Sequence, residues 1–185
     1  MTIRWGQLAE AVRSRFQGLS ERERYAYFLA LQLGRAVGVE GEDAEASDGA
    51  AGVTLALCAA TGIAVRADAG RLMREVFTEN NPQATSIQAA FFVTRKNREV
   101  GGEIARKGTA THVAGVVGRG VVMSFEHPRA CFRTVEELWT LCGLWDYDLR
   151  LRGLDRGALE RVAREGEGMY GSDAVVRELF EEERV

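Results

Sequence analysis

The two histidines of the chain, His112 and His127, are the first residues whose placement could support chemistry. They lie at the two ends of one stretch, THVAGVVGRGVVMSFEH (111–127), in which valine-rich runs flank Gly118-Arg119-Gly120. This pattern predicts a β-hairpin. With Arg119 and Gly120 as the turn, the histidines are direct cross-strand neighbours, with Cβ atoms roughly 5 Å apart. With Gly118 and Arg119 as the turn they lie one step apart on one face, and a three-residue loop separates them onto opposite faces.

Two imidazoles on one face of a hairpin supply half of a metal site. His112 and His127 are therefore candidate metal ligands only if carboxylates or Cys131 join them. His127 and Cys131 also suggest a base and a nucleophile, but Pro128 between them disfavours the helical turn that this pairing needs. We assign no catalytic residue and expect no cofactor.

Several common catalytic, metal-binding and nucleotide-binding motifs are absent from the sequence. It contains no GxSxG, P-loop or HExxH pattern, and no GxGxxG that opens a helix. The odd set of cysteines, Cys58, Cys131 and Cys142, forms no CxxC pair, which argues against a disulfide framework or a zinc site of that spacing. The aromatic residues Trp139, Trp145 and Tyr147 are expected to lie in the core. A small enzyme with a His/Cys site is therefore the last of three alternatives.

Composition places the chain among globular proteins. Its 185 residues are 46% hydrophobic, enough to bury a core. No run of 18 apolar residues predicts a membrane span, and the N-terminal stretch lacks the apolar segment of a signal peptide. These features predict a cytoplasmic protein without a membrane partner.

Charge is distributed unevenly along the chain. The net charge is -3, but residues 94–119 contain six basic and two acidic residues, a net of +4, so the remainder carries -7. The basic residues of this segment are Arg95, Lys96, Arg98, Arg106, Lys107 and Arg119. A cluster of this kind is typical of a nucleic-acid contact or of solvated surface.

The first part of the chain predicts a helical hairpin and a linker. Apolar residues at helical spacing predict a helix over 2–18, and the SERE sequence at Ser20 to Glu23 is a capping box that starts a second helix, ending near residue 37. Residues 39–52 are acidic and rich in glycine, as in a linker. We expect a helical hairpin over 1–38, this linker, and a globular body over 53–185. The alternative is one domain throughout.

The body is expected to be mostly helical. Helices are predicted over 53–65, with Gly62 as the stop, over 66–77, with Asp68 as N-cap, and over 86–100. A capping box from Thr134 to Glu137 starts another helix, and Asp155 and Ser172 are expected N-caps of helices over 156–165 and 173–183. The predicted fold class is a predominantly helical α+β protein with one β-hairpin, at 111–126.

The order of three helices followed by a hairpin, over residues 53–127, resembles a winged helix. The resemblance implies that 85–97 is the recognition helix, that the hairpin is the wing, and that Arg119 at its tip meets a minor groove. It covers about 75 residues and depends on element order and charge, because no specific motif supports it.

The sequence predicts a non-catalytic cytoplasmic protein with a binding or regulatory role. Nucleic acid is one expected ligand, bound through the basic segment 95–119. The alternative is a protein-interaction or adaptor module that binds a protein partner or a second copy of itself. The basic residues listed above are the candidate nucleic-acid contacts.

Overall fold

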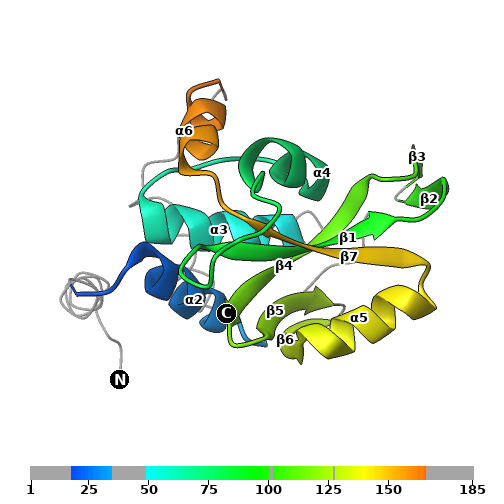
Figure 1. The fold of residues 1–185 in the computed structure, drawn as a ribbon, viewed down its shortest axis with the longest axis horizontal. Helices are drawn as coiled ribbons and strands as arrows, with labels where there is room; N and C mark the ends of the chain where they lie inside the picture. Colours follow the sequence, from blue (N-terminus) through cyan, green and yellow to red (C-terminus); the bar gives the residue numbers. More distant parts are fainter. Residues whose placement is uncertain (1–17, 35–48, 101, 127, 166–185) are drawn as a thin grey trace, which may run out of the picture.

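The structure is a computed structural model, which describes residues 18–34, 49–100, 102–126 and 128–165. Its centre is an antiparallel sheet of β1 (Gln88–Thr94), β4 (Ala110–Gly118), β5 (Val121–Glu126), β6 (Arg129–Thr134) and β7 (Tyr147–Gly153). The strand order is β6-β5-β4-β1-β7 (Figure 1). A separate two-stranded ribbon, β2 (Arg98–Val100) and β3 (Glu103–Ala105), lies between β1 and β4 in the chain.

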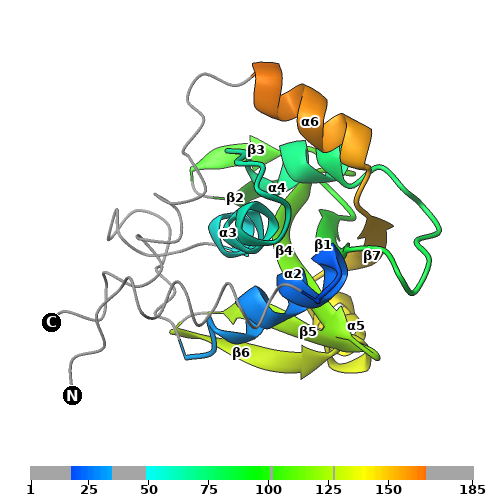
Figure 2. The same cartoon turned by 90° about the vertical axis from the view of Figure 1, so that its left-hand side faces the viewer.

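Helices pack against both faces of this sheet (Figure 2). One face carries α2 (Glu21–Ala30), α3 (Gly49–Thr61), α4 (Ala69–Arg71) with the π-helical turn η1 (Leu72–Val76), and α6 (Arg156–Glu165). These helices and the sheet bury the larger core, which includes Leu29, Leu57, Leu72, Phe91, Phe125 and Leu159. The other face carries α5 (Val135–Leu144), which closes a smaller core with Ala90, Phe92, Ala114 and Val122.

The four predicted N-caps that lie in the described residues are confirmed, although the helix predicted to start at residue 53 begins at Gly49. The Ser20 side chain accepts from the Glu23 backbone at 3.3 Å, and the Ser20 backbone donates to Glu23 at 2.7 Å. Thr134 and Glu137 form the same reciprocal pair at the start of α5. Asp68 and Asp155 accept from backbone N–H groups three residues on, at 2.7 and 2.9 Å. Local sequence therefore determines these helix starts.

The helix predicted over 86–100 is wrong, because residues 88–94 form the strand β1. Every residue of β1 after Gln88 is buried, since helices cover both faces of the sheet at this strand. A strand buried on both faces has no alternation of polar and apolar residues, so periodicity does not separate it from a buried helix. Phe91 and Phe92 therefore face opposite cores.

Two predictions about the fold class are also wrong, because residues predicted to be helical form strands of the sheet. The described residues are about 39% helix and 32% strand, so the protein is α+β without being predominantly helical. The winged-helix order also fails, because its recognition helix is β1 and its wing is β4 and β5 in the middle of the sheet. The hairpin itself is confirmed, but it is a structural element of the sheet.

Some predictions fall outside the described residues or are not tested by them. The helices predicted over 2–18 and 173–183, with the cap at Ser172, and most of the 39–52 linker lie outside the described part. Within it, α2 packs in the same core as α3 and β4, and α3 begins at Gly49. The division into 1–38, 39–52 and 53–185 stays a prediction. In the described ranges no helix has both the length and the apolar character needed to cross a bilayer.

Candidate functional site

All predicted basic residues except Arg119 gather at one end of the sheet, where β1 ends and β4 begins (Figure 1). Arg95 and Lys96 follow β1, Arg98 opens β2, and Arg106 and Lys107 lie between β3 and β4. Hydrogen bonds hold these loops together: the Thr94 hydroxyl donates to the Arg106 carbonyl at 2.7 Å, and the Lys107 backbone donates to Asn97 at 2.9 Å. We call this region the distal end.

Arg119 lies at the opposite end of β4. The strand has nine residues between the distal end and the Arg119 turn, which corresponds to roughly 30 Å of extended chain. Arg119 adopts a positive φ of 47°, and its neighbour Gly118 lies close to Arg22 at the start of α2. The structure therefore does not join Arg119 to the other candidate residues in one basic surface.

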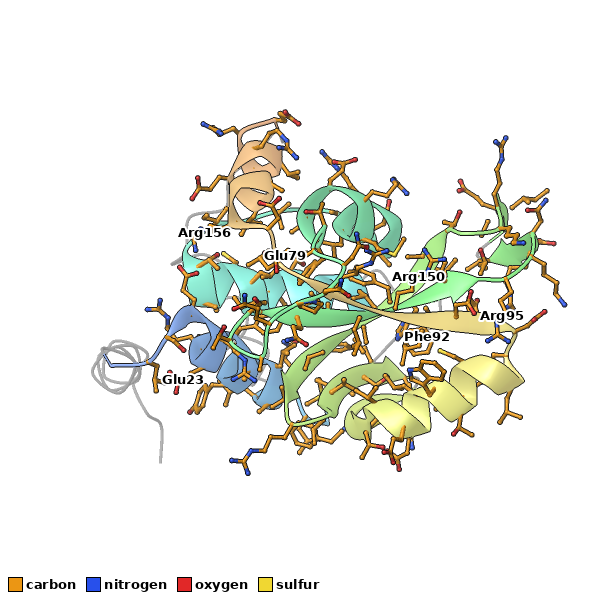
Figure 3. The ribbon with its side chains drawn as sticks, viewed as in Figure 1. Glu23, Glu79, Phe92, Arg95, Arg150 and Arg156 are labelled. Atoms are coloured by element: carbon orange, nitrogen blue, oxygen red, sulfur yellow. The ribbon has the colours of Figure 1, made fainter. Side chains whose placement is uncertain are left out.

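Two of the distal cations are paired with acids in the turn before β7 and at the start of β7. Arg95, which is labelled in Figure 3, contacts Asp148 at 2.8 Å, and Lys96 contacts Asp146 at 2.5 Å. The hydrogen bond to Asp148 raises the pKa of Arg95, and the hydrogen bond from Lys96 lowers the pKa of Asp146. Glu99 and Glu103 on the ribbon offset further positive charge. The distal end therefore carries far less unpaired positive charge than the number of its basic residues suggests.

Arg98 is held in place by an aromatic ring and a carbonyl. Its guanidinium lies 4.5 Å from the centre of the Tyr147 ring, and its Nη1 donates to the Trp145 carbonyl at 2.9 Å. Tyr147 in turn makes an edge-to-face contact with buried Phe92, with ring centres 6.3 Å apart. This chain of contacts orders Arg98 before any ligand arrives.

Large apolar side chains are exposed beside these cations. Leu144 and Trp145, at the end of α5, are 75% and 47% exposed, and Ile104 on the ribbon is 76% exposed. The expectation that Trp145 lies in the core is therefore wrong, as it is for Trp139, which is 64% exposed. In the ribbon Ile104 lies opposite Glu99 and Arg98 lies opposite Ala105, so Ile104 is on the other face from Arg98. We define the distal surface as Arg98, Arg106, Lys107, Leu144 and Trp145.

The turn that presents Trp145 is fixed by its backbone. Asp146, which follows Trp145, has a φ of 66°, in the left-handed region that non-glycine residues rarely adopt. Its carbonyl accepts from the Arg95 backbone at 3.3 Å, which ties the turn to the end of β1. The sequence signal that was missed is YDLRLRG (147–153), whose strict alternation predicts the strand that follows this turn.

The hairpin register does not make the two histidines direct partners. Gly118 lies opposite Val121. The register then shifts by one residue, so that Val116 lies opposite Val122. Direct pairing of His112 with His127 requires Val116 opposite Met123. His112 stacks edge-on against Phe92, with ring centres 5.0 Å apart, and His127 lies outside the described residues. Among the described residues no three His, Cys, Asp or Glu side chains are grouped as metal ligands.

None of the cysteines has the environment of an activated nucleophile. Burial raises the pKa of Cys58 and Cys131, and it raises the pKa of Cys142 to about 11. All three side chains are therefore thiols at neutral pH, whereas a catalytic cysteine needs a lowered pKa. This geometry gives the His/Cys enzyme alternative no support.

A two-point ion pair lies away from the distal end, between β5 and β6. Arg133 donates to both carboxylate oxygens of Glu126, at 3.1 and 2.7 Å. Burial raises the pKa of Glu126, but the hydrogen bond and charge of Arg133 outweigh it, so the net pKa falls below its ordinary value. A two-point pair of this kind fixes the two strands relative to each other.

This pair predicts a specific loss of stability in acid. Because the pKa of Glu126 is lower in the folded state, its contribution is fully present above the unfolded pKa near 4.5 and is lost as the pH falls below that value. We expect the urea midpoint of Glu126→Gln to be lower than that of the wild type at pH 7 and to change less between pH 6 and pH 3. Glu99→Gln, which removes an exposed carboxylate from the ribbon, is the control; equal pH profiles for wild type and Glu126→Gln would contradict the pairing.

Comparison with known proteins adds no family to this picture. No protein-family model matches the sequence, and no curated protein is significantly similar to it.

Proposed function

We propose that this chain is a non-catalytic binding protein whose ligand is another protein, and that the distal surface is the contact. The observation that carries the proposal is the exposure of Leu144 and Trp145 directly beside an ordered arginine, Arg98. Tryptophan and arginine are the residues in which binding energy is most often concentrated at protein interfaces.

The charge of the distal end favours a protein over nucleic acid. A nucleic-acid surface needs several cations free to meet successive phosphates. Here Arg95 and Lys96 are paired with aspartates, and Arg119 lies at the far end of β4. Among the basic residues of the distal end, only Arg106 and Lys107 are exposed without an ion pair to another described residue.

The same arrangement indicates the chemistry of the partner segment. Apolar side chains of the partner would cover Trp145 and Leu144, which removes apolar area from water. Carboxylates of the partner would meet Arg106 and Lys107, which form no ion pair with another described residue. The ligand we infer is therefore a protein segment that combines apolar and acidic residues.

Selection from a random peptide display library on the immobilised full-length chain tests this proposal. We expect the enriched peptides to combine apolar and acidic residues. Trp145→Ala should lower the affinity for the best synthetic peptide by about thirtyfold, which is the size of effect found at an interface hot spot. Trp139→Ala is the matched control, because it removes an even more exposed tryptophan from an earlier turn of α5 and should leave affinity unchanged.

Two outcomes would overturn the proposal. The first is a selection without enrichment, or one whose peptides bind Trp145→Ala as well as the wild type. The second is salt-dependent binding of labelled single-stranded or duplex DNA at low salt that the double variant Arg106→Glu, Lys107→Glu abolishes. That result would assign the same surface to nucleic acid.

A further inference from the structure

The strand β7 turns one row of backbone groups away from the sheet. It is the edge strand next to β1. Backbone groups of alternate residues in an antiparallel strand face the neighbouring strand and the edge. Gly153, the last residue of β7, exchanges hydrogen bonds of 2.9 and 3.2 Å with Glu79 on the side away from β1. By alternation, the other residues whose N–H and C=O groups face outward are Leu151, Leu149 and Tyr147.

These three residues form an open run of the sheet edge. No residue in the described part of the chain bonds to their outward backbone groups. Other groups bind only beyond the run, where Glu79 bonds to Gly153 and the Arg98 side chain bonds to the Trp145 carbonyl. The edge therefore has room for five residues of another strand, from Tyr147 to Leu151.

The side chains of β7 alternate between charged and apolar residues. Arg150 lies opposite Phe91 of β1, so the charged residues share the face of the larger core, and the apolar ones share the face of α5. Arg150 is exposed and forms no ion pair with another described residue. Asp148 is 47% exposed, and Arg95 bonds only its Oδ1 atom. An unpaired cation and a carboxylate with an open oxygen therefore lie two positions apart on the edge.

This charge pattern is complementary to itself. An antiparallel strand that pairs with its own copy has a two-fold axis at one of its outward residues. With the axis at Leu149, Arg150 lies directly opposite Asp148 of the partner subunit, and Arg152 lies opposite Asp146 of the partner subunit. Opposite charges then meet at every charged position of the run.

The other two registers bring like charges together. An axis at Leu151 sets Arg150 opposite Arg152 of the partner subunit, and an axis at Tyr147 sets Asp148 opposite Asp146 of the partner subunit. Like charges directly opposite each other destabilise a strand pair. The sequence of β7 therefore favours a single register of self-pairing.

We propose that β7 pairs with β7 of a second copy of this chain, so that the two sheets join across a two-fold axis at Leu149. The three outward residues of each copy give about six reciprocal backbone hydrogen bonds. On the apolar face, Leu149 meets its own copy and Leu151 meets Tyr147 of the partner subunit. The partner's chain reaches its turn at Asp146, which has a φ of 66°, before it arrives at the position that Glu79 occupies.

This inference goes beyond the proposed function, and the two can be tested separately. The paired run begins after Trp145, and the distal surface contains no residue of β7. Trp145→Ala should therefore dimerise as the wild type does, and Arg150→Asp should keep the wild-type affinity for the selected peptide. Either proposal can fail while the other stands.

Sedimentation velocity of the full-length chain over a wide concentration range tests the pairing. We expect a reversible dimer. Asp148→Arg and Arg150→Asp each set like charges opposite each other at two positions and should raise the dimer dissociation constant by roughly thirtyfold. In an equimolar mixture of the two variants, every cross-strand pair of the mixed dimer is again of opposite charge. The mixture should therefore dimerise with nearly the wild-type dissociation constant.

A charge reversal elsewhere is the control. Arg164→Asp changes an exposed arginine of α6 and should sediment as the wild type does. The urea midpoint of each variant checks that the fold is kept. A monomeric wild type, a single variant that dimerises as well as the wild type, or a mixture that dimerises no better than its components would each overturn the proposal.

Discussion

Replacing Phe91 by alanine should lower the free energy of unfolding by about 3–5 kcal/mol. The Phe91 side chain is fully buried in the larger core, where its ring packs against Phe77 with ring centres 5.6 Å apart. Its removal loses the transfer free energy of the ring and leaves a cavity between the sheet and its helices. Urea denaturation followed by circular dichroism measures the effect, with Phe91→Leu as a milder variant if the alanine chain does not fold.

The same substitution at the neighbouring residue, Phe92, tests whether β1 is a strand with both faces buried. Phe92 is 4% exposed in the other core, so Phe92→Ala should also cost about 3 kcal/mol. On a recognition helix with one exposed face, two adjacent phenylalanines would not both be fully buried. Trp139→Ala, at a 64% exposed position, should change stability by less than about 0.5 kcal/mol. A cost for only one of the two phenylalanines would contradict a strand between two cores.

Replacing Gly52 by alanine is expected to have the second largest effect, a loss of about 1–3 kcal/mol. Gly52 lies in α3, where the helix crosses the sheet. A Cβ added there would lie 2.1 Å from Cζ of Phe125, whose side chain is buried. Either α3 moves away from the sheet or Phe125 leaves its position, and both changes disturb the larger core.

A second helical glycine provides the matched control. Gly143 lies in α5, and an added Cβ there meets nothing within 4 Å. Alanine has a higher helix propensity than glycine, so Gly143→Ala should raise the free energy of unfolding by about 0.5–1 kcal/mol. Opposite signs for the same substitution are therefore expected, and a stabilising Gly52→Ala would contradict the close contact between α3 and β5.

Local signals predicted the helices well because they act over only a few residues. The capping boxes at Ser20 and Thr134 and the N-cap at Asp155 need nothing beyond three following positions. Gly62, the predicted stop of the helix that precedes it, directly follows α3 and has a φ of 74°. Hydrogen bonds within one turn determine these boundaries, so tertiary structure did not alter them.

The sheet was harder to predict because its pattern depends on what covers it. β1 is apolar throughout, since both of its faces are buried, and its two alanines favour a helix by propensity. β6 is a short edge strand whose residues alternate only weakly in burial. For β1, the distinction between helix and strand came from its pairing with β4 and β7, which are distant in sequence.

The candidate site was predicted in part. The basic residues 95–107 are close in sequence, and the ribbon folds them back onto the end of β1, so they remain together. Their neutralisation by Asp146 and Asp148 depends on the pairing of β7 with β1, which the sequence did not reveal. The exposure of Trp145 follows from the same turn. Charge counted along the sequence therefore overestimated the basic character of this surface.

Hydrogen–deuterium exchange of the wild-type chain, with and without the highest-affinity selected peptide, tests the central claim most directly. The distal surface as a protein-binding site predicts slower exchange in residues 95–100, 103–107 and 144–147 when the peptide is bound. The same peptide should leave the exchange of Trp145→Ala unchanged. Slower exchange confined to other parts of the chain, or no change in the wild type, would contradict the claim.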